Sequence, residues 1–434
     1  MQIAALYNFP VKKLPIFFCF GLLLQGFQSL IGREPPQEWI DAATGHRIIR
    51  LSRDPGTRVL YFNQNCYTES GDKIILTKGN KILVVDLKTR EIATLDTGIA
   101  QHIAVGRKSR QVYYTCDGVV YSTHIDTGIT REVAKLGTIT HILSGLTINA
   151  DETLLAGSYE LQNSDSNLDD YSETKFTISR NSKGHSAVTK QFDWNARLSA
   201  KIPMRLFTIN ISTGEANTFY PSTDMLNHVQ FSPSDPQLLM FCHDGPWQLV
   251  DRIWTIRTDG SQLKKIHTRT MELEIAGHEF FSHDGQIIWY DLQTPKSEVF
   301  WLAGSKMTTG EMVKYSVKRE NWSVHYGESP DGSLFAGDGG GRFSVAEKGK
   351  DGRFISFPVD GQWIFLFRPE EGSLRAERLV DLGDHDYRLE PNVTFTPDGK
   401  WIVFQSNMHG TVQVYAVEIQ KAAQGGPDQV KASQ

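Results

Sequence analysis

A short turn motif recurs along the chain and constrains its fold more than any other feature. The clearest copies are Ser-Pro-Asp-Gly or close variants at 282–285, 329–332 and 396–399, each between apolar, strand-like segments. Weaker copies bring the turn positions to seven, at 70, 109, 151, 234, 284, 331 and 398. Four of the intervals are 39, 42, 50 and 47 residues, which matches one four-stranded blade. The repeat therefore predicts an all-β fold, a seven-bladed β-propeller.

The intervals also predict how the chain is organised. Residues 33–422 form the expected propeller, and the stretch 39–51 resembles the last two strands of a blade that the C-terminal repeat begins. We expect N- and C-terminal strands to pair there and close the ring, because closure removes exposed sheet edges. The polar segment 162–200 lies in an interval longer than one blade and is expected to be a lid over one face. The Gly-rich run 337–342 is expected to be a loop, and residues 423–434 a polar tail.

The N-terminus is typical of an export signal. Lys12 and Lys13 precede an apolar run, Leu14 to Leu24, that is short for a membrane span. We expect residues 1–32 to be a signal peptide, the mature protein to be periplasmic or secreted, and no stable membrane span to remain. The alternative is an apolar N-terminal segment that packs or anchors.

Charge and cysteine content exclude some functions. The formal net charge is −5 and the isoelectric point about 6.2, which argues against a nucleic-acid partner. An acidic chain that binds an anion must do so with locally placed Arg, Lys or metal. Outside the expected signal, Cys66, Cys116 and Cys242 are scattered and odd in number, so no disulfide framework or metal motif is predicted. We expect these cysteines to be buried and structural.

Polar residues recur at one phase of the repeat. Six positions before four successive turns stand His228, His278, His325 and Asn392. The first strand of a propeller blade is innermost, so we expect these side chains to surround the axis. Period-two alternation adds Glu390 to the face of Asn392, with His385 just upstream. One inward histidine is usually a core residue, but three beside a carboxylate indicate a site. Nitrogen and oxygen ligands suit Mn²⁺, Zn²⁺, Fe²⁺ or Ca²⁺.

A second polar cluster lies in the segment 241–254. His243, Asp244, Asp251 and Arg252 gather around a turn that contains Gly245 and Pro246. Arg252 offers a planar fork of donors that fits a carboxylate. The alternative is a surface ion-pair network between Asp251 and Arg252.

Four stretches of the chain resemble one known family. They are CHDGPWQLVDRIW (242–254), GHEFF (277–281), VHYGESPDGSLFAGDGG (324–340) and PNVTFTPDGKW (391–401). Over about residues 38 to 420 the chain resembles the oligogalacturonate lyases, which are metal-dependent seven-bladed propellers that split short pectin fragments by β-elimination. The resemblance implies a lyase whose partner is an acidic oligosaccharide.

The resemblance also implies roles for single residues. His278 takes the position of the catalytic base, Arg252 that of the active-site arginine, and His325 that of one metal ligand. The sequence departs from the family's Gln-x-x-His-x-His run of ligands, because Tyr387, Glu390 and Asn392 stand there. We expect the metal, for which we favour Mn²⁺, to be held by His325, His385, Glu390 and Asn392. We expect substrate contacts from His228, His243 and Trp247.

Two other functions remain open at the level of sequence. A non-catalytic periplasmic propeller of the TolB type would share the Ser-Pro-Asp-Gly turns, but it would not require histidines at one repeat phase. A lyase for a different uronate-containing oligosaccharide would share the histidines, and the departure at 387–392 leaves its sugar undetermined.

Overall fold

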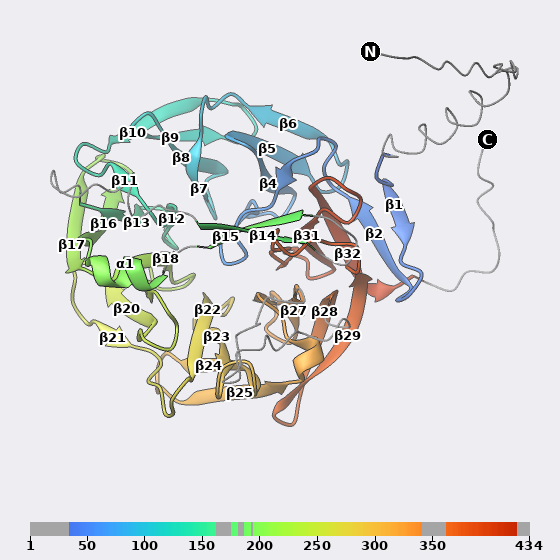
Figure 1. Ribbon diagram of the computed structural model, residues 1–434. Helices are drawn as coiled ribbons and strands as arrows, with labels where there is room; N and C mark the ends of the chain where they lie inside the picture. The colour runs from blue at the N-terminus through green and yellow to red at the C-terminus, as the bar shows by residue number, and fades with distance from the viewer. Residues whose placement is uncertain (1–33, 162–174, 181–185, 192–193, 341–361, 423–434) are drawn as a thin grey trace, which may run out of the picture. The chain divides into compact units, whose positions relative to one another are not determined.

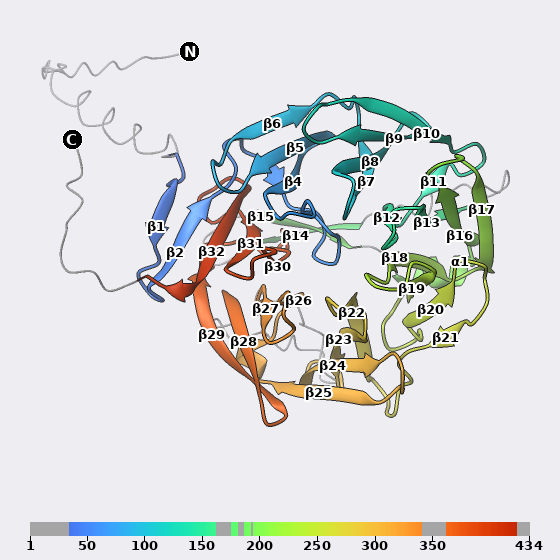
Figure 2. The same cartoon turned by 180° about the vertical axis from the view of Figure 1, so that it is seen from behind.

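The computed structural model describes residues 34–161, 175–180, 186–191, 194–340 and 362–422. The predicted signal segment and the polar tail lie outside these residues. Within the compact unit Gln37–Gln434, β-sheets follow one another around a ring, with their inner strands toward a common centre (Figures 1 and 2). Among the described residues, no helix is long and apolar enough to cross a membrane.

The sheets of the ring follow the order of the sequence repeat. Three of them have four strands in simple antiparallel succession. They are β3 Thr57–Arg58, β4 Lys73–Lys78, β5 Lys81–Asp86 and β6 Ile92–Leu95; β7 Gln101–Val105, β8 Gln111–Cys116, β9 Val119–His124 and β10 Thr130–Lys135; and β18 Met225–Phe231, β19 Leu238–Asp244, β20 Ile253–Arg257 and β21 Lys264–Lys265.

Two larger sheets continue the ring. One contains β11 His141–Ile142, β12 Thr147–Ile148, β13 Leu154–Glu160, β16 Met204–Asn210 and β17 Ala216–Ser222. The other joins two four-stranded halves, β22 Ile275–Phe281, β23 Ile287–Gln293, β24 Phe300–Lys306 and β25 Met312–Val317, then β29 Ser373–Asp381, β28 Trp363–Glu370, β27 Phe335–Gly337 and β26 Tyr326–Glu328. A single parallel bridge, Ser316 to Ser373, links the halves.

The last sheet combines strands from both ends of the described chain. It consists of β1 Glu38–Ile40, β2 His46–Arg50, β32 Gln413–Lys421, β31 Trp401–Ser406 and β30 Thr394–Phe395. β2 pairs antiparallel with β32, with Ile48 opposite Val417 and Arg50 opposite Tyr415.

Few helical residues are present in the described part of the chain. They form α1 Trp194–Ala200 and the 3₁₀ turn η3 Arg319–Asn321. Of the predicted lid, 162–200, the structure describes only the hairpin β14 Lys175–Arg180 with β15 Ser186–Gln191, and α1. The lid function stays a prediction.

The middle strands are buried on both faces. Ile74, Ile75 and Leu76 of β4 are each 0 % exposed, where half-buried strands would alternate. Each sheet in the ring packs between two neighbours, so both faces of its central strands lie in apolar clusters. β-Branched and aromatic side chains suit such strands, which explains the runs of Ile, Val, Phe and Tyr at these positions.

One backbone hydrogen bond closes the turn of each repeat. It runs from the end of an inner strand to the start of the next strand, seven times in the described residues. The donor and acceptor pairs are Thr68–Lys73, Gly106–Gln111, Asn149–Leu154, Ser232–Leu238, Ser282–Ile287, Ser329–Leu334 and Thr396–Trp401. This hydrogen bond identifies equivalent positions in the repeats more reliably than the sequence motif does.

Counting back four residues from each donor defines one position per repeat, in the innermost strand or in the segment next to it. These residues are Gln64, His102, Gly145, His228, His278, His325 and Asn392. His102, His228, His278 and Asn392 share a left-handed backbone, with φ between 48° and 54°. In β7, β18 and β22 the strand register shifts at these residues, so a β-bulge places each histidine where the ladder is interrupted.

Counting four residues on from each acceptor defines a second set, in the neighbouring strand or, for Asp338, directly after it. They are Thr77, Thr115, Ser158, Cys242, Asp291, Asp338 and Gln405. Each brings an oxygen, nitrogen or sulfur atom to an otherwise apolar stretch, and several form hydrogen bonds to adjacent segments. Ser158 Oγ donates to Leu226 O at 2.7 Å, and Gln405 Nε2 donates to Glu390 O at 2.7 Å.

Asp291 makes the stability of the fold depend on pH. Burial raises its pKa from 3.8 to about 7, although hydrogen bonds from Trp322 and Gln293 oppose the shift. The folded state therefore holds this proton more tightly than the unfolded chain. The resulting stabilisation is complete below about pH 4 and is lost as the pH rises through about 7. From pH 5 to pH 8 we expect wild type to lose about 3 kcal/mol relative to Asp291→Asn, at about 1.4 kcal/mol per unit of pKa shift. Urea unfolding at both pH values measures this; a difference independent of pH contradicts it.

Candidate active site

His325 is the most firmly held member of the histidine cluster. It is 0 % exposed, and its Nδ1 lies 2.8 Å from Asp338 Oδ2, while its backbone N–H donates to Asp338 Oδ1 at 2.8 Å. Its ring stacks on Phe62, with centroids 4.4 Å apart. Burial acts to lower the pKa of His325, but the charge and hydrogen bond of Asp338 outweigh it and raise the pKa. Asp338 thereby fixes the ring with Nε2 directed away from it, into the site.

The Nε2 side of His325 carries oxygen atoms that suit a metal. Tyr61 OH lies 3.2 Å from Nε2, and Glu390 Oε2 lies 3.8 Å from it. Asn392 donates its backbone N–H to Asp338 Oδ2 at 3.2 Å, and its buried Oδ1 has no hydrogen-bond partner among the described residues. One imidazole nitrogen with carboxylate and amide oxygens fits a divalent cation of the Mn²⁺ type. His325 Nε2 and the Glu390 carboxylate therefore lie close enough to share a cation, and Asn392, bound through its N–H to Asp338, is the nearby amide that would complete the set.

His278 lies against His325, with ring centroids 4.9 Å apart. Its Nδ1 is buried and has no hydrogen-bond partner among the residues that the structure describes. Burial lowers the pKa of His278, and nearby His325 and Arg252 lower it further, to well below the usual histidine value. The ring is consequently neutral at neutral pH and offers a nitrogen that can accept a proton.

Arg252 is held by two buried carboxylates. Its Nη1 donates to Asp244 Oδ1, and its Nε donates to Glu279 Oε2 at 3.1 Å. Burial acts to lower the pKa of Arg252, but Asp244 and Glu279 raise it to well above its usual value. The sequence alternative of an Asp251–Arg252 pair is wrong, because Asp251 contacts Lys265 at 2.9 Å and Arg269 at 3.5 Å instead. Arg252 is thus a permanent cation with a fixed orientation.

Trp247 connects Arg252 with His278. The guanidinium carbon lies 4.9 Å from its ring centroid, and the His278 ring meets it edge-on at 4.9 Å. Gly277 is required for this packing, since a Cβ there would lie 2.8 Å from the indole ring. The structure therefore brings Trp247, predicted to contact substrate, to the edge of the cluster.

His228 belongs to the same neighbourhood. Its Nδ1 lies 3.6 Å from Glu279 Oε1, and both atoms are buried without a hydrogen bond to any described residue. Burial lowers the pKa of His228. The ring of Tyr61 meets it edge-on at 5.4 Å. With Cys242 and Asp244, His228 also forms a group that could hold a metal ion, but the guanidinium of Arg252 bound to Asp244 opposes a cation there.

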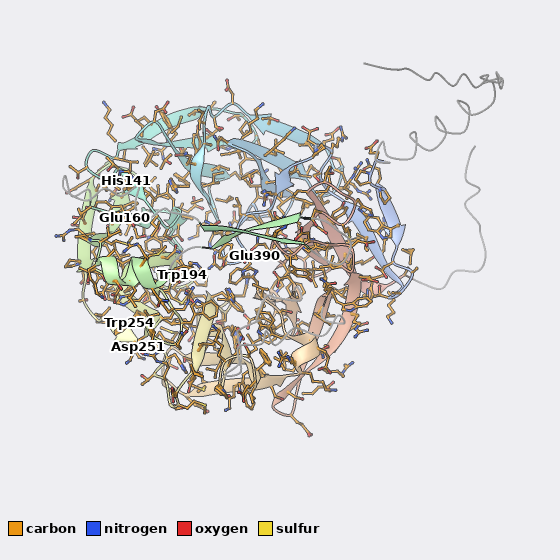
Figure 3. All side chains as sticks on the ribbon, in the orientation of Figure 1. His141, Glu160, Trp194, Asp251, Trp254 and Glu390 are labelled. Atoms are coloured by element: carbon orange, nitrogen blue, oxygen red, sulfur yellow. The ribbon has the colours of Figure 1, made fainter. Side chains whose placement is uncertain are left out.

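Two predicted residues lie apart from the cluster. His243 stacks on Trp254, with Tyr220 OH 3.1 Å from its Nε2 and Asp224 3.2 Å from its Nδ1. Figure 3 shows Trp254 near the rim of the ring and Glu390 near its centre. His385 engages Ser406 Oγ at 2.9 Å and Leu389 O at 2.7 Å. A backbone carbonyl can only accept, so Nε2 of His385 carries the proton, and the lone pair of its Nδ1 accepts the Asn407 N–H at 3.4 Å. Neither nitrogen of His385 therefore has a lone pair for a metal in this conformation, whereas the Tyr61 hydroxyl beside His325 Nε2 can donate to a lone pair there.

Several residues of the cluster were missed by the sequence reasoning. Asp338 and Glu279 are both 0 % exposed, and Tyr61 and Phe62 come from a segment without strand structure. A signal existed for two of them. Asp338 is a carboxylate in the second-strand set of the repeat, and Glu279 directly follows the predicted base. Cys66 and Cys242 are buried as expected, whereas Cys116 is partly exposed.

An all-β ring with a neutral histidine, a fixed arginine and a metal-type donor set at its centre defines an enzyme of the β-propeller class. The sequence comparisons make this specific. The model of the oligogalacturonate lyase family matches residues 36–423. The chain belongs to this family and is a polysaccharide lyase, which decides against the non-catalytic propeller.

Relatives and solved structures agree with the family. The chain is 25% identical to the oligogalacturonate lyase of Dickeya dadantii (strain 3937) over 403 residues, covering 87% of this chain and 95% of that protein. It is 27% identical to the oligogalacturonide lyase of Pectobacterium atrosepticum over 224 residues, covering 50% and 55%. An oligogalacturonate lyase solved in complex with manganese is 23% identical, with a TM-score of 0.71 over 90% of this chain and 98% of that one. The oligogalacturonate lyase of Vibrio parahaemolyticus is 22% identical with a TM-score of 0.68, covering 88% and 96%.

Proposed function

We propose that the protein is a metal-dependent lyase that cleaves short oligogalacturonides by β-elimination and leaves an unsaturated uronate. The observation that carries this proposal is the buried His278 Nδ1, which has no partner among the described residues and lies beside Arg252 and the His325 donor set. The names of the family's characterised members support the substrate class.

The proposed reaction needs one proton transfer and one bond cleavage. His278 accepts the proton from the carbon beside the uronate carboxylate. The electron pair forms a carbon–carbon double bond, the bond to the 4-linked oxygen breaks, and that oxygen takes up a proton. A base whose ring is neutral at the working pH suits the first transfer. Burial of His278 keeps it in that state.

Arg252 orients the substrate and stabilises the charge that develops. Asp244 and Glu279 engage Nη1 and Nε, and no hydrogen bond to Nη2 is present among the described residues. A guanidinium has five N–H donors, so the Nη2 donors remain for a substrate carboxylate. Fixed positive charge next to developing negative charge lowers the barrier. The side chain of Trp247, which packs between Arg252 and His278, gives a sugar ring an apolar surface.

The cation, for which we favour Mn²⁺, would be held by His325 Nε2, the Glu390 carboxylate and Asn392 Oδ1. A bound divalent cation would act as a Lewis acid on the uronate carboxylate. This set differs from the sequence prediction by the loss of His385. The structural similarity to an oligogalacturonate lyase that was solved with manganese supports the choice of metal.

Removing the carboxylate that orients His325 is expected to weaken metal binding. Asp338→Asn should reduce affinity for Mn²⁺ by about 10- to 100-fold, because partners of metal-binding histidines typically contribute that much. Metal content after dialysis and a Mn²⁺ titration measure this without any turnover. Asp291→Asn is the matched control, since Asp291 occupies the equivalent repeat position outside the cluster. Equal Mn²⁺ affinity in wild type and Asp338→Asn would remove His325 from the metal site.

The reaction is tested with digalacturonate and added Mn²⁺, with and without a chelator. We expect ultraviolet absorbance of an unsaturated uronate that the chelator abolishes. The same assay with a glucuronate-containing disaccharide tests the alternative that the enzyme cleaves an oligosaccharide of a different uronate. No absorbance from either sugar with folded, metal-loaded protein would contradict the lyase reaction.

We also propose that the ring is a seven-bladed propeller closed by β2 and β32, and that the protein is exported. The turn hydrogen bond that occurs seven times and the antiparallel β2–β32 pairing support the architecture. The basic and apolar segment at 12–24 supports export. Fractionation of the producing cell, with N-terminal sequencing of the mature protein, tests export.

A further inference from the structure

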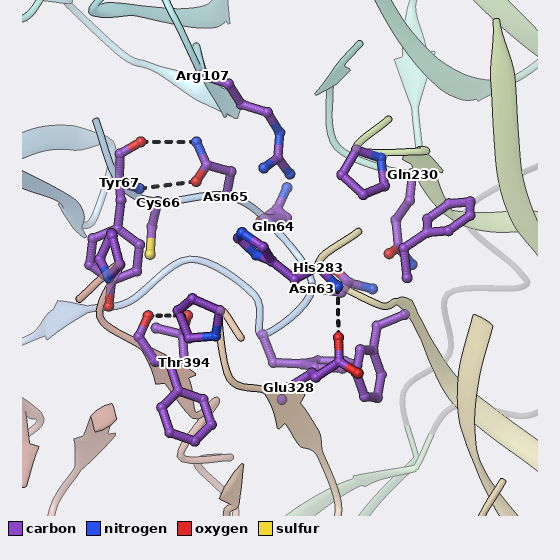
Figure 4. A pocket seen from close by; sticks show the side chains of 18 of the residues that line it. Asn63, Gln64, Asn65, Cys66, Tyr67, Arg107, Gln230, His283, Glu328 and Thr394 are labelled. Carbon is purple, nitrogen blue, oxygen red and sulfur yellow. Dashed lines mark hydrogen bonds between the residues drawn. The ribbon is translucent and has the colours of Figure 1, made fainter. Parts of the chain in front are cut away.

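A second cavity lies at the turn ends of the inner strands. Its volume is about 440 Å³, within the range of small-molecule sites. None of the residues proposed for catalysis or metal binding lines it. Its polar side chains come from several repeats (Figure 4), and the ones that matter most are Asn63, Gln64, Arg107, Gln230 and His283.

Arg107 is the group that gives the cavity its chemistry. It is partly buried in the cavity wall, and no hydrogen bond or ion pair to its guanidinium occurs among the described residues. In the nearby Glu152 carboxylate, Oε1 accepts the backbone N–H groups of Lys108 and Ser109, and Oε2 is buried without a hydrogen bond to any described residue. Burial lowers the pKa of Arg107, and the nearby charge of Glu152 only partly opposes this shift. A desolvated cation without a partner favours binding of an anion.

Two carboxylates line the cavity, Glu69 and Glu328, and neither forms an ion pair with Arg107 among the described residues. Glu328 Oε1 accepts the Trp289 indole N–H at 3.0 Å, and Oε2 accepts the His283 backbone N–H at 2.7 Å. The imidazole of His283 lines the same cavity as Arg107 (Figure 4), and its pKa is lowered by burial and by the charge of Arg107. The cavity therefore presents a guanidinium and an imidazole, and both carboxylate oxygens of Glu328 are already engaged by protein donors.

The remaining lining suits a sugar. The side-chain amides of three residues line the wall, and in each of them one polar atom is already hydrogen-bonded to the protein. Asn63 Nδ2 and Gln230 Nε2 donate to Glu279 O, and Gln64 Oε1 accepts the Tyr61 N–H. The other amide atoms remain for hydroxyl groups. Phe62, Phe280 and Phe281 add apolar surface, which can pack against the face of a pyranose ring.

We propose that this cavity binds a small sugar acid, a hexuronate, with the Arg107 guanidinium receiving the carboxylate and the amides receiving the hydroxyls. The assignment of a carboxylate rests on Arg107. The choice of a hexuronate among carboxylates rests on the proposed function, because such sugars are the units of the proposed substrate. The site is separate from the histidine cluster, and Phe62 lies between them, lining the cavity and stacking on His325.

The test is a calorimetric titration of the full chain with galacturonate, galactose and inorganic phosphate. Galacturonate is a monomer with no bond to cleave, so its binding does not depend on lyase activity. Arg107→Gln should weaken galacturonate binding at this site at least about tenfold, since a charge-assisted hydrogen bond contributes about that factor. Arg110→Gln is the matched control, because Arg110 lies outside the cavity and pairs with Asp72 and Asp126.

We expect Arg110→Gln to bind galacturonate like wild type, galactose not to bind, and Arg107→Gln to keep its turnover of digalacturonate. Unchanged galacturonate affinity in Arg107→Gln would overturn the proposal, as would equal binding of galactose. Phosphate binding at Arg107 in preference to galacturonate would overturn the sugar-acid assignment. Failure of the lyase reaction would instead appear as lost turnover with this binding intact.

Discussion

His278→Ala is expected to lower kcat for formation of the unsaturated uronate by about three orders of magnitude, the effect typical of losing a general base. The His278 Nδ1 atom is buried without a hydrogen-bond partner among the described residues, so the substitution removes the proposed proton acceptor and breaks no recorded hydrogen bond of the ring. KM should change little, because Arg252 and the metal-type donor set remain. Steady-state kinetics on digalacturonate with saturating Mn²⁺ measure both constants.

His102→Ala is the matched control for this variant. His102 occupies the same repeat position, with φ 48° against 51° for His278. Both substitutions therefore place alanine in the same left-handed backbone, with the same local strain. We expect His102→Ala to keep most of the kcat. If the two variants lose equal activity, the loss reflects the backbone of the bulge and not proton transfer.

Arg252→Lys is expected to lower kcat/KM by about 100- to 1,000-fold, the cost typical of removing one donor that stabilises developing charge. Lysine keeps the charge but cannot reach Asp244 and Glu279 in a planar fork while also offering donors to the substrate. Its loss of the two contacts leaves buried carboxylates poorly paired. Kinetics at saturating Mn²⁺ and a thermal melt follow the two effects separately.

Arg257→Lys provides the control, at the end of β20, the strand that begins directly after Arg252. Arg257 pairs with Asp235 at 2.7 Å in a partly exposed position, and surface pairs of this kind contribute little. We expect neither its kcat/KM nor its melting temperature to change measurably. A kcat/KM within about threefold of wild type for Arg252→Lys would exclude the proposed role of Arg252.

Position within the repeat was a good guide to the site wherever the turn motif is intact. Counting from the turns selected His278 and His325, and the structure brings their rings into contact at 4.9 Å. It also selected Asn392, whose N–H binds the carboxylate that holds His325. The same counting missed His102 by one residue, because the motif at 108–110 is degraded and only the backbone hydrogen bond shows its true register.

Prediction of site residues from their position in the repeat failed where the chain forms no regular strand. His385 lies in a turn between β29 and β30, where period-two alternation has no meaning, and its two nitrogens bind protein oxygens. Asp338 was missed for the opposite reason, since a Gly-rich run was interpreted as a loop. Asp338 follows β27 directly and is completely buried. Side chains of adjacent residues in β19 point to opposite faces of the sheet. His243 therefore contacts Trp254 and Tyr220, whereas Asp244 binds Arg252 in the cluster.

The pairing of β2 with β32 has a consequence for biogenesis. Residues 46–50 emerge early in synthesis, but their hydrogen-bonding partner at 413–421 is made near the end. Non-local pairing of this length is a slow folding step. The sheet therefore cannot assemble while the chain is growing, and β2 stays without its neighbour until translation has passed residue 421.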